Sequence, residues 1–333
     1  MHTILFSWPF QFDTIEPYVQ MLRTAGLALR TPQSDRFGRG EMNEEETIGE
    51  LQGVSAVIAW AETYTSKVIA AAPDLQVIAR AGVGYDKVNI ESATDHDIVV
   101  TITPSANFES VAEHTFALLL AVARSIAHYD RRTRAGQWQF RTVLPLRGRV
   151  LGLIGLGRIG RSVALRASAF GMKILAFEPQ PDLPFVRRHG IELLDLPSLL
   201  ARSDFVSLHC PLNDETRGMI NRDVLAQMKG GAVIVNASRG GLIVEKDLAA
   251  SIESGHLAGA GLDVFEHEPA EPGNPLFKLD NVVVSPHVAG CDSQSAHDMA
   301  AEAAQNILCL ARGEWPESAV VNAELKPRWR WGG

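Results

Sequence analysis

The sequence predicts an α/β protein in which helices cover parallel β-sheets. Short apolar runs alternate with longer amphipathic segments along the whole chain, and this alternation is typical of parallel strands joined by helices. The apolar runs are nearly continuous, as expected for strands that are buried on both faces. The strongest strand–glycine turn–helix pattern begins mid-chain, near residue 150, so a smaller α/β unit is expected to precede it.

The strands are predicted from short β-branched or apolar runs. In chain order they are 3–6, 55–58, 75–78, 150–154, 172–177, 205–208, 232–235, 258–262 and 282–284. The helices are predicted where apolar residues recur at helical spacing. The clearest of these segments are 16–25, 66–72, 161–169 and 246–254.

One predicted helix, 110–124, is apolar almost all round beyond its first turn. Ser110 followed by Glu113 has the spacing of a capping box, which would mark its start. A helix of this composition is expected to be buried, either between two domains or at a subunit contact.

The last part of the chain contains a further helical segment, 292–312, and an extended segment, 318–321. Both are expected to return to the first unit and make it discontinuous. The final residues, 326–333, read KPRWRWGG and are typical of a mobile end.

Charge and cysteine content exclude several classes of protein. The chain has 39 acidic and 31 basic residues, a net charge of −8, and no long basic run, so we expect no nucleic-acid or anionic-membrane partner. The start, MHTILFSWPFQF, lacks a basic leader, and the longest purely apolar stretch, 116–123, is too short to span a membrane. Cys210, Cys291 and Cys309 form no CxxC pair, which suits a cytoplasmic protein without a thiolate zinc site.

The glycine-rich turn predicts a dinucleotide-binding site. Gly155, Gly157 and Gly160 form GxGxxG between an apolar strand and a helical segment. These glycines allow a tight turn, close approach to a pyrophosphate and close helix–strand packing, and the helix N-terminus attracts the anion. Glu178 follows the next strand, 21 residues after Gly157, where an acid is expected to bind the ribose hydroxyls and to favour NAD over NADP. The alternative is a glycine-rich turn with a solvent-facing glutamate.

Chemically active residues also follow the later strands. Because ligands of a doubly wound sheet lie beyond the carboxyl ends of its strands, these residues are expected at one ligand-binding edge. A histidine–carboxylate pair there suits acid–base catalysis, and an arginine suits a carbonyl or carboxylate. Taken singly, each has a simpler explanation as a solvated or loop side chain. The residues concerned are Arg239, the cluster Asp263, Glu266, His267 and Glu268, and His287.

Several motifs, in order and at matching spacing, give the chain a resemblance to the D-2-hydroxyacid dehydrogenase family over nearly its whole length. They are RAGVGYDKV (80–88), ANFESVAEHTFALLLAVAR (106–124), RGRVLGLIGLGRIGRSVA (147–164), SLHCPLNDETRGMIN (207–221), VNASRGGLIVEKDL (235–248), GAGLDVFEHEPA (259–270) and VVSPHVAG (283–290). Within the family, the chain resembles the phosphoglycerate dehydrogenase-like branch.

The resemblance implies that Arg239, Glu268 and His287 are the catalytic set. Arg239 would bind the substrate and polarise its keto oxygen. Protonated His287, oriented by Glu268, would give that oxygen a proton during hydride transfer from the nicotinamide. The carboxylate of the 2-oxo acid would bind the backbone N–H groups of Gly82, Val83 and Gly84.

The resemblance also implies the domain organisation. A Rossmann-type, doubly wound parallel sheet, 104–288, would bind NAD. It would be inserted in a smaller, flavodoxin-like α/β substrate domain, 1–103 plus 289–325, with 326–333 as a tail, and the protein would be a homodimer. The cofactor contacts would come from Gly155, Gly157, Arg158, Ile159, Gly160, Glu178, Cys210, Pro211, Ala237, Ser238, Asp263 and Gly290.

The identity of the substrate stays open at this point. Arg80 resembles an arginine that can help to bind phosphate in phosphoglycerate dehydrogenases, or it is a surface residue near the hinge. Those enzymes often carry Arg-Ser where this chain has Trp60 and Ala61. Trp60 suits a smaller or apolar substrate such as glyoxylate or hydroxypyruvate, or belongs to the core. The chain also ends before a serine-sensing domain would begin.

The sequence also bears on three alternatives to this enzyme. An NAD(H)-sensing regulator would keep the fold without turnover, although the complete catalytic set favours an enzyme. A zinc-dependent alcohol dehydrogenase would need cysteine ligands near the N-terminus, whereas no cysteine precedes Cys210. The related formate dehydrogenases carry glutamine where Glu268 stands.

Overall fold

The computed structural model describes residues 2–7, 17–140 and 142–331, so Glu16, the start of one predicted helix, lies outside the described residues. The chain divides into two compact units. The first consists of Met1–Asn107 and Ser293–Gly333, and the second is Phe108–Asp292. The strands pair in parallel in both units. The predicted α/β fold class with parallel sheets is therefore confirmed.

The first unit contains a five-stranded sheet of order β2-β1-β3-β4-β5. Its elements are β1 (Thr3–Phe6), α1 (Pro17–Thr24), β2 (Ala28–Arg30), α2 (Glu44–Leu51), β3 (Ala56–Ala59), α3 (Ser66–Ala70), β4 (Val77–Arg80), α4 (Ile90–Asp95), β5 (Val99–Thr101), α12 (Ser293–Ala311) and the short 3₁₀ helix η3 (Ala323–Leu325).

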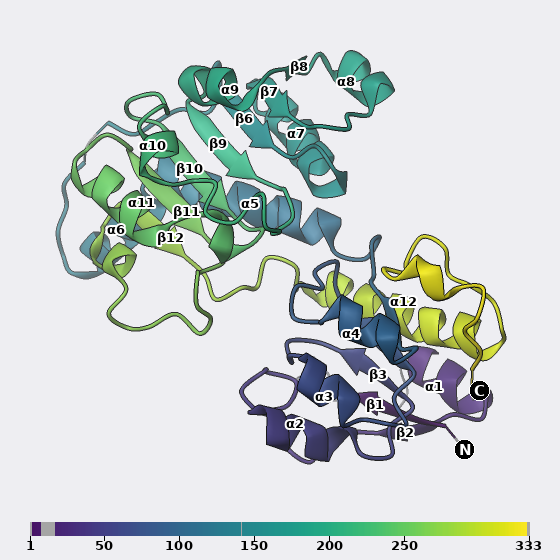
Figure 1. Ribbon diagram of the computed structural model, residues 1–333. Helices are drawn as coiled ribbons and strands as arrows, with labels where there is room; N and C mark the ends of the chain where they lie inside the picture. The colour runs from purple at the N-terminus through teal and green to yellow at the C-terminus, as the bar shows by residue number, and fades with distance from the viewer. Residues whose placement is uncertain (1, 8–16, 141, 332–333) are drawn as a thin grey trace. The chain divides into compact units, whose positions relative to one another are not determined.

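Two helix layers cover this sheet, because successive side chains of a strand point to opposite faces. Ile4 and Phe6 pack with residues of α1 and α12, whereas Leu5 packs with residues of α2 and α3. Helices α1 and α12 contact each other although they come from opposite ends of the chain (Figure 1). Val320 forms an antiparallel bridge with Thr101 of β5, so the segment after α12 also belongs to this unit.

The second unit contains a seven-stranded sheet of order β12-β11-β10-β9-β6-β7-β8. Its elements are α5 (Phe108–Ala123), α6 (Ile126–Arg134), β6 (Val150–Ile154), α7 (Arg158–Ala169), β7 (Lys173–Phe177), α8 (Leu183–His189), β8 (Glu192–Leu193), α9 (Leu196–Arg202), β9 (Phe205–Leu208), α10 (Arg222–Leu225), β10 (Val233–Asn236), η1 (Gly240–Leu242), α11 (Glu245–Glu253), β11 (Gly259–Leu262), η2 (Pro275–Lys278) and β12 (Val282–Val284).

The order of these strands reverses at β6. The chain runs outward from β6 to β7 and β8, and then β9 pairs with the other side of β6. In open α/β sheets, ligands bind beyond the carboxyl ends of the strands at such a reversal. The sheet is buried on both faces: Leu151 and Leu153 of β6 pack with α5 and α7, whereas Ile154 packs with α9, α10 and α11. The second unit therefore offers a ligand-binding edge between β6 and β9.

Helix α5 packs on the sheet of its own unit (Figure 1). A Cβ atom on Gly261 of β11 would lie 2.9 Å from the Cβ atom of Leu118, and one on Gly259 would lie 3.1 Å from Cγ1 of Val122. These glycines let the helix approach the strands closely. The apolar composition of α5 is thus explained by its own sheet, and it requires neither a second domain nor a partner subunit.

The predicted start of this helix is wrong. Helix α5 begins at Phe108, so Ser110 lies inside it. The Ser110 hydroxyl donates to the carbonyl of Ala289 (2.8 Å), and Glu113 pairs with Arg166 (3.1 Å). Neither side chain serves the predicted capping box, because each has a tertiary partner.

The prediction of a mobile end at 326–333 is also wrong for its described part. Trp329 is only 7% exposed and packs in the core cluster that contains α1 and α12. Its ring lies 6.0 Å from that of Trp331 and 6.2 Å from that of Trp315, measured between centroids. The tryptophans bury apolar area against the first unit, which outweighs the basic and glycine-rich composition of the segment.

Within the described ranges, no single helix is long and apolar enough to cross a membrane. The pair α5 and α6 meets the length and composition criteria only jointly, and it is bent by 60° at its junction.

Candidate active site

The GxGxxG turn has the geometry of a dinucleotide-binding loop. Gly155 has a φ of +99°, and a Cβ atom there would lie 2.6 Å from the backbone of His209. A Cβ atom on Gly160 would lie 2.3 Å from the carbonyl oxygen of Gly155. By contrast, a Cβ atom on Gly157 would meet nothing within 4 Å. Two glycines therefore serve packing, and the third leaves open space where a bound group can approach the backbone.

Helix α7 begins directly after Gly157, the glycine that leaves open space. Gly157 is its N-cap residue and supplies no side-chain cap, so Arg158 and Ile159 open the first turn with uncapped N–H groups. Glu178 lies at the end of β7, where its Oε2 atom accepts a hydrogen bond from the backbone of Leu156 (2.8 Å). The predicted ribose-binding acid therefore lies against the glycine loop. This arrangement fits a dinucleotide, with the pyrophosphate at the helix N-terminus.

Alanine substitutions can distinguish Gly157, which leaves space for a ligand, from Gly160, which serves packing. We expect Gly157→Ala to keep the wild-type melting temperature, because its φ of −68° is open to any residue. The added methyl group should lower NADH affinity by about tenfold or more, since it fills the space of the pyrophosphate. Gly160→Ala should instead lower the melting temperature. Calorimetric titration with NADH and thermal unfolding of both variants check this, and unchanged affinity in Gly157→Ala would contradict the assignment.

The remaining predicted cofactor contacts follow the neighbouring strands. The Ser238 hydroxyl donates to the carbonyl of Cys210 (2.7 Å), which ties the loop after β10 to the loop after β9. Burial raises the pKa of the Cys210 thiol to about 11, and burial lowers the pKa of His209 to about 3. Both groups are therefore uncharged near neutral pH. Pro211 and Ala237 lie in the same two loops, and Gly290 follows β12.

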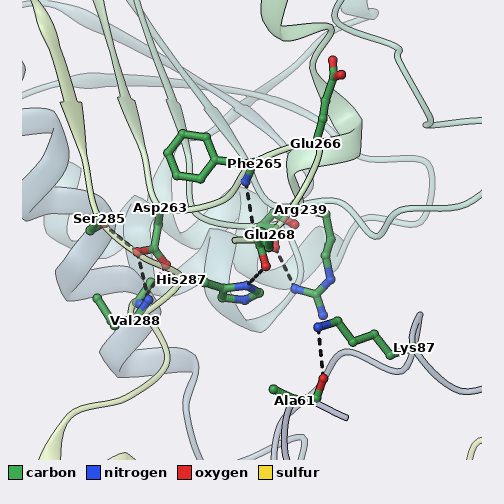
Figure 2. A network of polar contacts seen from close by, with 12 residues as sticks. Ala61, Lys87, Arg239, Asp263, Phe265, Glu266, Glu268, Ser285, His287 and Val288 are labelled. Atoms are coloured by element: carbon green, nitrogen blue, oxygen red, sulfur yellow. Dashed lines mark hydrogen bonds and ion pairs between the residues drawn. The ribbon is translucent and has the colours of Figure 1, made fainter. Parts of the chain in front are cut away.

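Glu268 and His287 form a direct pair in the second unit. Nδ1 of His287 lies 2.7 Å from Oε2 of Glu268, and the other carboxylate oxygen accepts from the backbone of Phe265 (3.1 Å). The imidazole is 45% exposed. Because Nδ1 faces Glu268, Nε2 is the ring nitrogen that is left to exchange a proton with a ligand. Figure 2 shows Glu268 between His287 and Arg239.

Arg239 extends from a turn that is fixed by Asn236, the last residue of β10. The Asn236 side chain donates to the Arg239 carbonyl (2.8 Å) and accepts from the Ser238 backbone (3.0 Å). Gly240 then packs so closely that a Cβ atom there would lie 1.9 Å from the carbonyl group of Phe265. The turn that carries Arg239 is thereby fixed against the segment that carries Glu268. Asn236 was not predicted to have a role, although its position at a strand end was the available signal.

The other acidic residues of the predicted cluster have different partners. Glu266 points away from His287 (Figure 2), and its carboxylate accepts from the backbone of Glu245 at the start of α11 (2.7 Å). Asp263 is 0% exposed, and its carboxylate accepts hydrogen bonds from Ser285 (2.6 Å) and from two backbone amides. Of these three acids, Glu268 is the one whose carboxylate bonds the His287 ring. A contact of Asp263 with nicotinamide stays a prediction.

The predicted carboxylate loop of the first unit is partly occupied by the protein itself. The Gly82 N–H group donates to Oγ1 of Thr103 (2.7 Å), and the Gly82 carbonyl accepts from the Thr103 backbone (3.0 Å). The Gly82 N–H group therefore has a protein partner in this structure, and its binding to substrate stays a prediction. Substrate binding by the N–H groups of Val83 and Gly84 stays a prediction.

Arg80 holds this loop through a hydrogen bond to Gly84. It is 9% exposed, its Nε atom donates to the Gly84 carbonyl (3.1 Å), and its guanidinium also donates to the carbonyl of Trp60. Glu62, which the sequence analysis missed, is 1% exposed and accepts from the Trp60 backbone (2.8 Å). Burial raises the pKa of Glu62, while Arg80 acts in the opposite direction. These contacts give Arg80 a structural role, and direct substrate binding by Arg80 stays a prediction.

Trp60 packs beside the core cluster that contains α1 and α12. Of the two roles considered for Trp60, its packing supports the core role.

No group of three or more histidine, cysteine or acidic residues suited to a metal ion occurs among residues 2–7, 17–140 and 142–331.

Comparison with known proteins places this site in context. Residues 116–289 match the family model for the NAD-binding domain of D-isomer specific 2-hydroxyacid dehydrogenases. A glyoxylate reductase of Korarchaeum cryptofilum is 42% identical over 79% of this chain and 81% of its own length. A D-3-phosphoglycerate dehydrogenase of Archaeoglobus fulgidus is 40% identical over 86% of this chain, which spans only 55% of that relative. The crystal structure of a glyoxylate reductase from Paecilomyes thermophila is 28% identical, with a TM-score of 0.84, and covers 97% of this chain and 99% of its own.

Proposed function

Because the chain belongs to the D-isomer specific 2-hydroxyacid dehydrogenase family, we propose that it is an NAD-dependent oxidoreductase acting on small 2-oxo and 2-hydroxy acids. It would transfer a hydride between the nicotinamide and C2 of the acid. The observation that carries this proposal is the pair formed by His287 and Glu268, with Nδ1 2.7 Å from Oε2, beside Arg239 (Figure 2).

In this proposal Arg239, His287 and Glu268 have different roles. Arg239 polarises the keto oxygen. It also binds the substrate carboxylate, because a guanidinium can form two parallel hydrogen bonds with a carboxylate. Protonated His287 gives the keto oxygen a proton from Nε2, and neutral His287 takes it back in the reverse reaction. Glu268 orients the ring and stabilises its charged form. NADH, when bound, supplies the hydride.

The cofactor preference follows from Glu178. Its carboxylate lies against the glycine loop at Leu156, where it would accept the two ribose hydroxyls and repel a 2′-phosphate. The following residues, Pro179, Gln180 and Pro181, offer no arginine for such a phosphate.

Two substrate types remain proposals. Relatives named D-3-phosphoglycerate dehydrogenase and glyoxylate reductase both match the chain at about the same identity, 40% and 42%. The buried position of Arg80 supports a substrate without phosphate, such as glyoxylate or hydroxypyruvate. The N–H groups of Val83 and Gly84 would bind its carboxylate.

A substrate screen tests the proposal. Glyoxylate, hydroxypyruvate, pyruvate and 3-phosphohydroxypyruvate are each offered with NADH and with NADPH, and kcat/KM is measured for every pair. We expect turnover of at least one acid, with NADH preferred by about tenfold or more, equivalent to about 1.4 kcal/mol. Equal use of both cofactors would contradict the role of Glu178. Tight NADH binding without turnover would contradict the enzyme and favour an NAD(H)-sensing regulator.

Three further properties stay predictions. They are a homodimeric assembly, a cytoplasmic location and the lack of nucleic-acid or membrane partners.

A further inference from the structure

His287 lies in the segment from Ser285 to Ala289, and the backbone conformation of this segment is held by hydrogen bonds. His287 has a φ of +54°, in the left-handed region that residues other than glycine rarely adopt. Three consecutive backbone N–H groups of this segment bind a single residue, Asp263. That of His287 donates to the Asp263 carbonyl (2.7 Å), that of Val288 to Oδ1 (3.0 Å) and that of Ala289 to Oδ2 (2.8 Å). The buried aspartate thus fixes the conformation that presents His287 to Glu268 (Figure 2).

The Asp263 carboxylate is itself held by two side chains. Oγ of Ser285 lies 2.6 Å from Oδ1 of Asp263, and Nε2 of His114 lies 2.7 Å from Oγ of Ser285 and 3.4 Å from Oδ1. Burial by itself would raise the pKa of the Asp263 carboxyl. The hydrogen bonds from His114, Ser285 and the two amides hold that pKa below its usual value.

The ionised state of Asp263 determines which groups donate in these contacts. An ionised carboxylate only accepts hydrogen bonds, so the Ser285 hydroxyl must donate to Asp263. The Ser285 oxygen is then the acceptor for His114, which must carry a proton on Nε2. The result is a chain of aligned donors, and such chains strengthen each of their hydrogen bonds.

Helix α5 holds the same segment at a second point. Ser110 precedes His114 by four residues and therefore lies on the same face of the helix. Its hydroxyl donates to the carbonyl of Ala289 (2.8 Å). One face of α5 thus contacts both ends of the segment from Ser285 to Ala289, and the helix is anchored by its packing on the sheet.

We propose that His114 is a positioning residue for the reaction, which acts through Ser285 and Asp263 to hold His287 in its left-handed, Glu268-bound conformation. Its effect on turnover rests on the proposed function. Its effect on the segment does not, because the hydrogen bonds are present without substrate. His114 touches neither His287 nor Glu268, so the sequence offers no local signal for this role.

The test uses His114→Ala, His114→Gln, Ser285→Ala and the double variant His114→Ala/Ser285→Ala. Each single alanine variant should lower kcat for the best 2-oxo acid about tenfold, with KM and the Kd for NADH changed less than about threefold. The double variant should be no slower than either single variant, because both break one chain. His114→Gln should recover kcat to within about threefold of wild type, because its amide can donate at a similar reach. His256→Ala is the matched control, since His256 is also half-buried and bonds the Leu225 carbonyl (3.1 Å) away from the segment.

Hydrogen exchange of the Val288 and Ala289 amides gives a readout that needs no turnover. Exchange should be at least about tenfold faster in His114→Ala and Ser285→Ala than in wild type, and unchanged in His256→Ala. Unchanged exchange and unchanged kcat in both alanine variants would overturn the proposal, as would additive effects in the double variant. A wild-type protein that reduces no 2-oxo acid would contradict the proposed function alone, because amide exchange would still decide the role of His114.

Discussion

Replacing His287 with alanine is expected to slow reduction of the 2-oxo acid and oxidation of the 2-hydroxy acid by about 10²–10⁴-fold, the usual contribution of a general acid or base. Imidazole is a side-chain group that can both give and take a proton in catalysis, and Nδ1 of His287 is already bound to Glu268. His209 also follows a strand at this edge, but burial lowers its pKa to about 3. It therefore stays neutral and cannot replace His287 as the acid.

The affinity for NADH should survive in His287→Ala, since the predicted dinucleotide contacts lie at the GxGxxG loop and Glu178. Steady-state kinetics in both directions and an NADH titration make the measurement. His267→Ala is the control, because His267 is an exposed histidine directly before Glu268 and should leave both rates near the wild-type values. A His287→Ala variant with full activity would refute the mechanism.

Gly240→Ala is expected to have a comparably large effect without removing any catalytic group. The new Cβ atom would lie 1.9 Å from the carbonyl group of Phe265, which is backbone and cannot rotate away. The turn that carries Arg239 must then move away from the segment that carries Glu268. A displacement of about 1 Å in a catalytic set can cost about 10²-fold in rate, and overpacking costs about 1–3 kcal/mol in stability.

The neighbouring glycine supplies the control for this prediction. A Cβ atom on Gly241 would first meet the side chain of Leu212 at 3.1 Å, and a leucine side chain can adjust. We therefore expect Gly241→Ala to stay within about threefold of wild-type kcat/KM, since volume changes next to flexible side chains are tolerated better. Wild-type kcat/KM in Gly240→Ala, or an equal loss of activity in both variants, would contradict this role of Gly240.

The sequence was most informative where backbone requirements restrict the residue type. Gly155 and Gly160 are each surrounded by backbone that excludes a Cβ atom, so a motif could locate the loop. The rule that parallel strands end at one edge also located Arg239, Glu268 and His287, because it depends only on strand order.

The same rule does not give side-chain directions. Glu266 and Glu268 lie two residues apart, yet one bonds the start of α11 and the other bonds His287. Which acid faces the histidine depends on how the segment after β11 turns. The contact of His114 with Ser285 joins residues that are 171 positions apart, so no local pattern could indicate it.

Three short strands and the packing of the chain end were also missed for physical reasons. Strands β2, β5 and β8 contain three, three and two residues, too few for a periodic pattern. The end of the chain looked mobile by composition, whereas burial of Trp329 decides its structure. At the chain end, tertiary contacts thus outweigh local composition.

The most direct test of the acid–base pair is the pH–rate profile of Glu268→Gln, measured in both directions. Glutamine keeps the shape of the side chain and removes the charge that favours the protonated ring of His287. Less of the ring is then protonated at neutral pH, so the pH range of reduction should move to lower values. Oxidation requires the neutral ring and should lose less near neutrality. Glu266→Gln, which alters the acid that bonds α11, should leave both profiles in place, whereas an unshifted reduction profile in Glu268→Gln would contradict the pairing of Glu268 with His287.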